Sequence, residues 1–190
     1  FCLVMGVAGS GKSTVGRLIA EAAGFEFRDG DDLHSPQAIE KMRGGTPLDD
    51  ADRLPWLDRI AEWIVGRLSS SSSCVVACSA LRRTYRDRIR AGIRPFPLAV
   101  VFLTADRTVL AARLAVRQSH FMPATLLDSQ LATLEAPDGE AAVPPDATVV
   151  RNTHSRTLAA ELAAAHVRSA LAGAGNAWRG IVLKKIDTRS

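Results

Sequence analysis

The segment from Gly6 to Thr14 constrains the fold of this chain more than any other part of its sequence. It reads G-V-A-G-S-G-K-S-T, which has the glycine spacing of a phosphate-binding loop that ends in Lys12 and Ser13. An apolar, β-prone run at positions 2–5 precedes the loop and a helical pattern follows it, so the motif has the strand–loop–helix context that it requires. The sequence therefore predicts a site for nucleotide phosphates in an α/β fold.

Each part of the loop has an expected task at a triphosphate. The glycines allow backbone conformations that a Cβ would forbid, so successive N–H groups can turn toward one anion. Lys12 is expected to reach the β- and γ-phosphates, and the Ser13 hydroxyl to ligate Mg²⁺. ATP and Mg²⁺ are thus the expected cofactors, and the expected nucleotide-binding residues of the loop are Gly6, Val7, Ala8, Gly9, Ser10, Gly11, Lys12, Ser13 and Thr14.

The length and charge of the chain favour a single domain that handles small anions. With 190 residues, one domain is expected over residues 1–172, followed by a tail at 173–190. The formal charge of +4 is mild, and a small polyanion such as ATP explains it without nucleic acid. No apolar run approaches the roughly 18 residues that a membrane helix needs. Cys2, Cys74 and Cys78 are expected as buried thiols of a reduced, cytoplasmic protein.

A cluster of acidic residues follows the second expected strand, at positions 25–28. The segment 29–34 contains Asp29, Asp31, Asp32 and His34. Crowded carboxylates are costly unless a cation or a hydroxyl-bearing substrate uses them. The alternative is an acidic turn that caps the next helix, at 36–42. Because the cluster follows the phosphate loop closely, we favour a functional role.

Arg53 stands at the entrance of a longer helix, where a cation opposes the helix dipole. Pairing with Asp49 or Asp50 would explain its position, and so would binding of an anionic substrate; sequence spacing leaves both open. The stripe that follows recurs at helical spacing and is expected in the core: Trp56, Ile60, Trp63 or Ile64, and Leu68.

Residues 74–78 are nearly all apolar and are expected as a strand buried on both faces. This strand lacks the terminal Asp that many phosphate-loop enzymes place beside Mg²⁺, which raises the importance of Asp29 and Asp31. In the helix that follows, Arg83, Arg86 and Arg90 share one face. They form either a solvated basic face or a grip in which one or two arginines bind a carboxylate or phosphate.

The second half of the chain contains an expected flap. After a strand at 97–103, Asp106 is expected to cap a helix that runs to about Arg117. Arg113 and Arg117 lie four residues apart, so an anion between them would relieve their repulsion. A loop at 118–123 and a helix at 124–135 complete a mobile lid at about 117–135. A fifth strand is expected at 147–150 and a helix at 158–171, and the tail is either disordered or an added edge strand.

These motifs together resemble the gluconate kinase (gluconokinase) family of small phosphate-loop kinases, which is related to shikimate and nucleoside monophosphate kinases. The resemblance covers roughly residues 3–137. Besides the loop, the matching blocks are residues 29–34, Gly45 to Leu57, Cys78-Ser79-Ala80-Leu81, Tyr85-Arg86-Asp87, His120-Phe121-Met122-Pro123, Ser129-Gln130 and Leu134-Glu135. The chain departs from the family pattern at Ser35, which separates His34 from Pro36, and at Ala38, Asp49, Arg82 and Arg83.

The resemblance implies a three-layer α/β/α fold with a five-stranded parallel sheet in the order 2-3-1-4-5 and a helical lid. It implies a cytoplasmic enzyme, often a homodimer, that phosphorylates D-gluconate to 6-phosphogluconate with ATP, without nucleic acid or membrane partners. Two alternatives are a kinase of another small hydroxy acid, such as shikimate, and a nucleotide-binding switch that hydrolyses ATP slowly without an acceptor.

The resemblance also assigns roles to particular residues. Asp31 would accept the proton of the attacking hydroxyl or orient it, and Asp29 with Ser13 would hold Mg²⁺. Lys12 and Arg117 would neutralise charge on the transferred phosphoryl group, with Arg113 also near ATP. The residues expected to bind the acceptor are Asp31, His34, Arg53, Arg83 or Arg86, and His120.

Overall fold

A parallel sheet forms the centre of the computed structural model, which describes residues 1–68, 73–96, 98–116, 126–137, 147–151 and 182–183. The strand order is β2-β3-β1-β4-β5-β6, and every neighbouring pair is parallel. The strands are β1 Cys2–Met5, β2 Glu26–Asp29, β3 Cys74–Ala77, β4 Ala99–Thr104, β5 Ala147–Arg151 and β6 Val182–Leu183. The expected order 2-3-1-4-5 is confirmed, and β6 adds an edge strand from within the tail.

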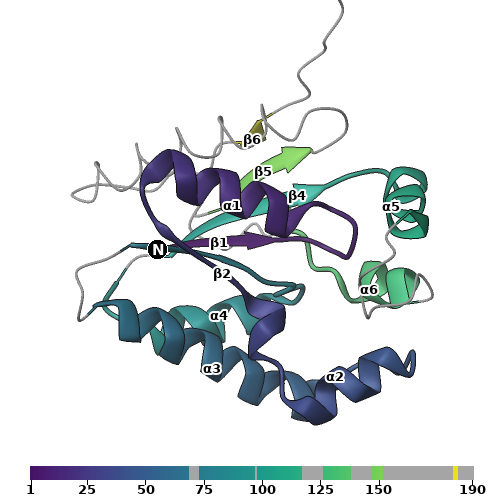
Figure 1. The fold of residues 1–190 in the computed structure, drawn as a ribbon, viewed down its shortest axis with the longest axis horizontal. Coiled ribbons are helices and arrows are strands. Elements are labelled where there is room, and N and C mark those ends of the chain that lie inside the picture. Colours follow the sequence, from purple (N-terminus) through teal and green to yellow (C-terminus); the bar gives the residue numbers. More distant parts are fainter. Residues whose placement is uncertain (69–72, 97, 117–125, 138–146, 152–181, 184–190) are drawn as a thin grey trace, which may run out of the picture.

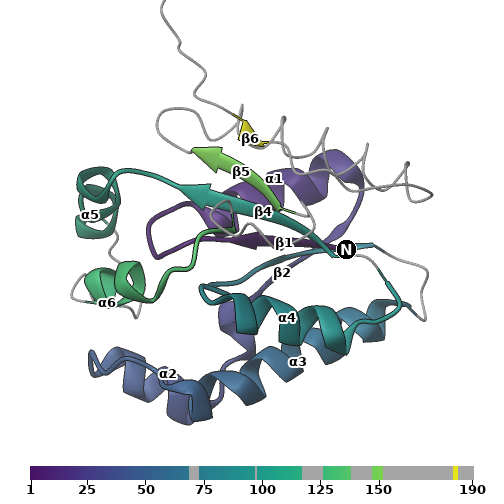
Figure 2. The same cartoon turned by 180° about the vertical axis from the view of Figure 1, so that it is seen from behind.

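Helices cover both faces of this sheet (Figures 1 and 2). Helix α1 lies on one face and helices α3 and α4 on the other, while α5 and α6 lie beyond the carboxyl ends of the strands. Their bounds are α1 Lys12–Ala23, α2 Pro36–Arg43, α3 Asp50–Leu68, α4 Arg83–Gly92, α5 Arg107–Ala115 and α6 Leu126–Thr133; a 3-10 turn, η1, spans Gly30–Leu33. The three-layer α/β/α architecture is therefore confirmed.

The core follows from the alternation of side chains along the strands. Leu3 and Met5 pack with Trp56, Ile60 and Ile64 of α3 on one face, so the predicted core stripe is confirmed at these three positions of the helix. Cys2 and Val4 point to the other face and pack against α1. All four residues of β3 are buried, as expected for a strand covered on both sides. The three cysteines are buried free thiols, as expected.

The starts of helices α2 and α5 are capped differently. Ser35, which departs from the family pattern, caps α2: its Oγ accepts the N–H of Ala38 at 3.1 Å, with Pro36 in the first turn. Asp106 does occupy the cap position of α5, but its side chain makes no capping hydrogen bond. The predicted position of Asp106 at the start of this helix is therefore confirmed, without a capping bond from its side chain.

Several predictions lie outside the described residues. These are Arg117, His120, the segment 117–125 of the expected lid, the helix at 158–171, and the tail apart from β6. Within the described residues, no helix combines the length and the hydropathy that a membrane span would need.

Candidate active site

The phosphate loop joins the carboxyl end of β1 to the first turn of α1, as predicted. Gly6 has φ 146° and Gly9 has φ 79°, conformations that favour glycine. A Cβ at Gly6 would also collide with the carbonyl oxygen of Leu103. The Lys12 ammonium donates to the carbonyl of Val7 at 3.3 Å, so the cation is held over the loop. The N-terminus of α1 adds the positive end of its dipole, and the whole forms an anion cradle.

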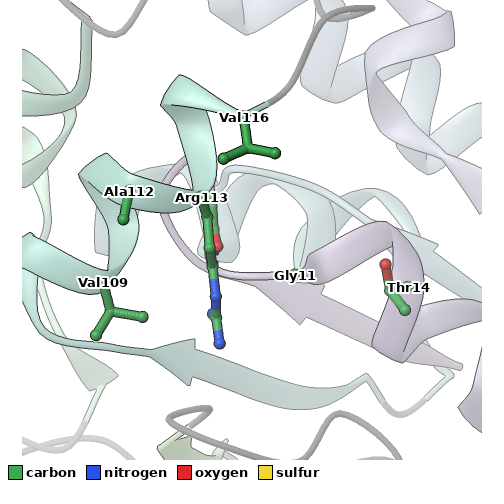
Figure 3. Close-up of a pocket in the computed structure, with 7 residues that line it drawn as sticks. Gly11, Thr14, Val109, Ala112, Arg113 and Val116 are labelled. Atoms are coloured by element: carbon green, nitrogen blue, oxygen red, sulfur yellow. Dashed lines mark hydrogen bonds between the residues drawn. The ribbon is translucent and has the colours of Figure 1, made fainter.

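A pocket of about 530 Å³ opens between this loop and α5 (Figure 3). Aliphatic side chains of α5 and the Arg113 guanidinium face the loop across it, and Arg113 Nη1 lies 3.4 Å from the carbonyl oxygen of Gly9. An apolar wall with a cation next to a phosphate cradle suits the base and ribose of a nucleotide. The lining residues are Gly9, Gly11, Thr14, Val109, Ala112, Arg113 and Val116.

Ser13 and Asp29 form a pair of oxygen donors beside the loop. The Ser13 hydroxyl donates to Asp29 Oδ2 at 2.6 Å, although the two residues belong to different elements. Within the described residues, no group of three or more His, Cys, Asp and Glu side chains could hold a metal ion. Mg²⁺ keeps several waters and binds phosphates together with only one or two protein oxygens, so this donor pair fits it.

The acidic segment is fixed in place by side chains of α3. Trp56 Nε1 donates to the carbonyl of Gly30 at 2.7 Å, and Arg59 Nε donates to the carbonyl of Leu33 at 2.7 Å. Asp29 Oδ1 in turn accepts the backbone N–H of Asp31 at 3.2 Å. The turn therefore presents Asp29 to Ser13 and places Asp31, whose side chain is 19% exposed, directly after it.

His34 lies buried at the end of the same turn. Its ring stacks on Trp56, with centroids 4.1 Å apart and an interplanar angle of 14°. Its Nε2 lies 4.0 Å from Asp31 Oδ1, and its buried Nδ1 has no hydrogen-bond partner among the described residues. Burial, and then the charges of Arg53 and Arg59, lower the pKa of His34 to about 4. The imidazole is therefore neutral at physiological pH and can both donate and accept a hydrogen bond.

Arg53 is held at the start of α3 by a reciprocal cap. Asp49 Oδ1 accepts the N–H of Asp52 at 3.0 Å, and Asp52 Oδ2 accepts the N–H of Asp49 at 3.2 Å. Arg53 Nε donates to the carbonyl of Leu48 at 3.2 Å, and its guanidinium carbon lies 5.9 Å from the centre of the Tyr85 ring.

The two ion pairs that would have given Arg53 a purely structural role do not form. Asp49 lies 3.9 Å from Lys41, and Asp50 pairs with Arg82 at 3.1 Å. Arg53 makes no ion pair in the described part of the chain. Because only Nε of Arg53 hydrogen-bonds to other described residues, the terminal N–H groups of the fork are available for an anion.

The arginines of α4 have different surroundings from one another. Arg86 is 3% exposed, and its Nη1 donates to the carbonyls of Ala80 and Leu81, each at 3.1 Å. This geometry gives Arg86 a structural role, so we leave it out of the proposed acceptor-binding set. Arg83 and Arg90 lie closer to solvent and share Asp87, at 3.5 and 2.6 Å. Arg83 or Arg86 was expected to bind the acceptor substrate, and Arg83 is therefore the candidate that we keep.

Known proteins resemble this chain in both sequence and structure. A family model described as an AAA domain matches residues 1–137. A gluconokinase of Gluconobacter oxydans is 46% identical over 137 residues, which cover 72% of this chain and 76% of that protein. The chain belongs to the gluconokinase family. A gluconokinase structure from Sinorhizobium meliloti is 44% identical, with a TM-score of 0.76 over 92% of this chain and 97% of that one. A sugar kinase structure from Janibacter is 40% identical, with a TM-score of 0.78 over 90% and 95%.

Two contacts of this gluconokinase-family chain were missed by sequence reasoning. Gln130 on α6 accepts the backbone N–H of Ala8 in the phosphate loop at 2.7 Å. The Tyr85 hydroxyl donates a short hydrogen bond to Asp50 Oδ1, which also binds Arg82. Both link segments that are far apart in sequence, so no local spacing could reveal them. The only available signal was membership of Gln130 and Tyr85 in the blocks shared with the family.

The environment of His34 predicts a pH effect on stability. In the unfolded chain His34 has a pKa near 6.5, whereas in the folded protein the pKa is about 4. Between these values the unfolded state binds more protons, so the unfolding free energy falls as pH decreases from 6.5 to 4. We expect this residue to contribute up to about 3 kcal/mol of that loss. The unfolding free energy, measured with urea at pH 7, 6 and 5, should depend less on pH in His34→Gln than in the unaltered protein. An equal pH dependence in both proteins would contradict a lowered pKa of His34.

Proposed function

We propose that this protein transfers the γ-phosphoryl group of ATP to the C6 hydroxyl of D-gluconate, giving ADP and 6-phosphogluconate. The observation that carries the proposal is one juxtaposition at the carboxyl edge of the sheet. The Ser13–Asp29 oxygen pair adjoins the phosphate loop, Asp31 follows on the same turn, and the Arg53 fork is left without an ion pair among the described residues. Gluconokinases among its relatives support the choice of acceptor.

On the nucleotide side, the backbone of the loop would bind the phosphates. Lys12 would neutralise the negative charge on the transferred phosphoryl group. Ser13 and Asp29 would hold Mg²⁺, directly or through water; when bound, Mg²⁺ neutralises charge on the phosphate oxygens. Arg113 lines the nucleotide pocket and would contact ATP. Arg117 is proposed to act on the same phosphates.

On the acceptor side, gluconate offers one carboxylate and several hydroxyls. The Arg53 fork suits the carboxylate, since charge-assisted bidentate hydrogen bonds are strong and directional. Arg83 would add a second cation. The neutral imidazole of His34 would bind a sugar hydroxyl, as would His120.

Asp31 would orient the C6 hydroxyl and take its proton. The hydroxyl oxygen forms a bond to the γ-phosphorus while the bond from that phosphorus to the β–γ bridging oxygen breaks, and ADP leaves with the electron pair. Closure of the proposed lid would exclude water, which otherwise competes as acceptor.

The proposal is tested by coupled detection of ADP release in the presence and absence of D-gluconate. We expect turnover that depends on gluconate and requires Mg²⁺, and that is lost in Lys12→Ala. An acceptor panel containing shikimate and other small hydroxy acids identifies a different kinase if one of them gives the higher kcat/KM. Turnover that does not respond to any acceptor would instead support a nucleotide-binding switch.

A homodimer and a cytoplasmic location remain further proposals, which rest on the family resemblance. Light scattering of the purified chain tests the first, and localisation in cells tests the second.

A further inference from the structure

Helix α6 lies against the nucleotide loop, although 122 positions separate Gln130 from Ala8. Leu127 is buried in a cluster with Val7 and Leu110, and Leu131 packs against the same cluster. These apolar contacts determine which face of α6 packs against the loop.

Gln130 is the polar residue at the centre of this contact. Gln130 is only 6% exposed, and its Oε1 accepts the N–H of Ala8 at 2.7 Å. Because a backbone N–H can only donate, the oxygen of the amide must face the loop. The bond therefore has one orientation, and a side chain without an acceptor could not replace it.

A second anchor of α6 lies outside the loop. Just after the helix, the N–H of Glu135 donates to the carbonyl of Leu81 at 2.9 Å. The Glu135 carboxylate accepts the N–H of Arg83, the first residue of α4. Gln130 thus projects from a helix that is also bonded, through Glu135, to Leu81 and to the start of α4.

We propose that Gln130 is a positioning residue for phosphoryl transfer, which holds the first half of the phosphate loop in its phosphate-binding conformation. Ala8 lies between Gly6 and Gly9, whose positive φ values mark a segment with wide conformational freedom. A hydrogen bond to Ala8 restricts that freedom before ATP arrives, so the N–H groups that follow already face the phosphates. The inference rests on the proposed transfer from ATP, but not on the identity of the acceptor.

The test compares Gln130→Met with Asp128→Asn on the same helix. The first substitution keeps the length of the side chain but removes the amide oxygen that accepts the Ala8 N–H. Asp128 is 64% exposed and pairs with Arg107 on the outer side. We expect Gln130→Met to weaken MgADP binding, measured by calorimetry, by roughly 5–150-fold, because the Ala8 N–H loses its acceptor. Asp128→Asn should bind MgADP as the unaltered protein does.

The two KM values separate an effect on the phosphate loop from a general disturbance of the active site. Gln130→Met should raise the KM for ATP while the KM for gluconate, at saturating ATP, stays close to that of the unaltered protein. A folded Gln130→Met with unchanged MgADP affinity would overturn the proposal, and so would an equal rise in both KM values.

A second measurement needs no variant. In the unaltered protein, hydrogen exchange at the Ala8 amide should be slow, since this N–H is bonded inside the protein. Exchange as fast as at an open loop amide would overturn the proposal even if Gln130→Met fails to fold. Neither MgADP binding nor amide exchange uses an acceptor, so these results stand whatever the acceptor panel shows.

Discussion

Replacing Asp31 with asparagine should lower kcat with gluconate by about 10²–10⁴-fold, the usual contribution of a positioned general base. The substitution keeps the size of the side chain but removes its ability to take the proton of the attacking hydroxyl. The hydrogen bond from the Asp31 N–H to the Asp29 carboxylate does not involve the Asp31 side chain and should persist. ATP affinity, measured by calorimetry, should therefore change little.

Asp32→Asn is the matched control for this substitution. Asp32 is the next residue along, its side chain is 61% exposed, and it lies 3.8 Å from Arg28 rather than facing the site. The same chemical change there should leave kcat nearly unaltered, because exposed ion pairs contribute little. If Asp31→Asn retains near-normal turnover, Asp31 has no part in the mechanism.

Replacing Arg53 with alanine should raise the KM for gluconate by about 10–150-fold, the range expected when a hydrogen-bonded charge pair is lost. The carboxylate of gluconate is remote from the transferred group, so the KM for ATP should change much less. Steady-state kinetics with each substrate varied in turn measures both values.

Arg88→Ala controls for the loss of one positive charge. Arg88 forms an exposed bidentate pair with Asp58, at 2.6 and 2.7 Å, and is not among the residues proposed to bind gluconate. Its removal should leave the KM for gluconate nearly unchanged. If Arg53→Ala also leaves this KM unchanged, another cation binds the carboxylate.

Local patterns predicted the parts of the fold and site that depend on local physics. The glycines of the phosphate loop, the helix that begins at Lys12 and the apolar strand at Cys74–Ala77 are all encoded within a few residues. The pairing of Asp29 with Ser13 was expected from the family resemblance alone. In the structure the two side chains meet because strands β1 and β2 end at the same edge of a parallel sheet.

The rest depended on contacts that local spacing cannot specify. Arg86 has the same periodicity as Arg83, yet only Arg86 turns toward the carbonyls of Ala80 and Leu81. The bond from Ala8 to Gln130 and the bond from Tyr85 to Asp50 arise from how α6 and α4 pack on distant segments. The direction in which a side chain leaves a helix is set by this packing and by the carbonyls that packing leaves without donors.

The arrangement of the two substrates is the central claim, and a crystal structure with ADP, Mg²⁺ and D-gluconate tests it most directly. The account predicts that the C6 hydroxyl lies within hydrogen-bonding distance of the Asp31 carboxylate and points toward the place of the γ-phosphate. It also predicts the gluconate carboxylate on the Arg53 fork. A gluconate bound with C6 remote from Asp31, or an Asp31 side chain that faces away from the nucleotide, would contradict it.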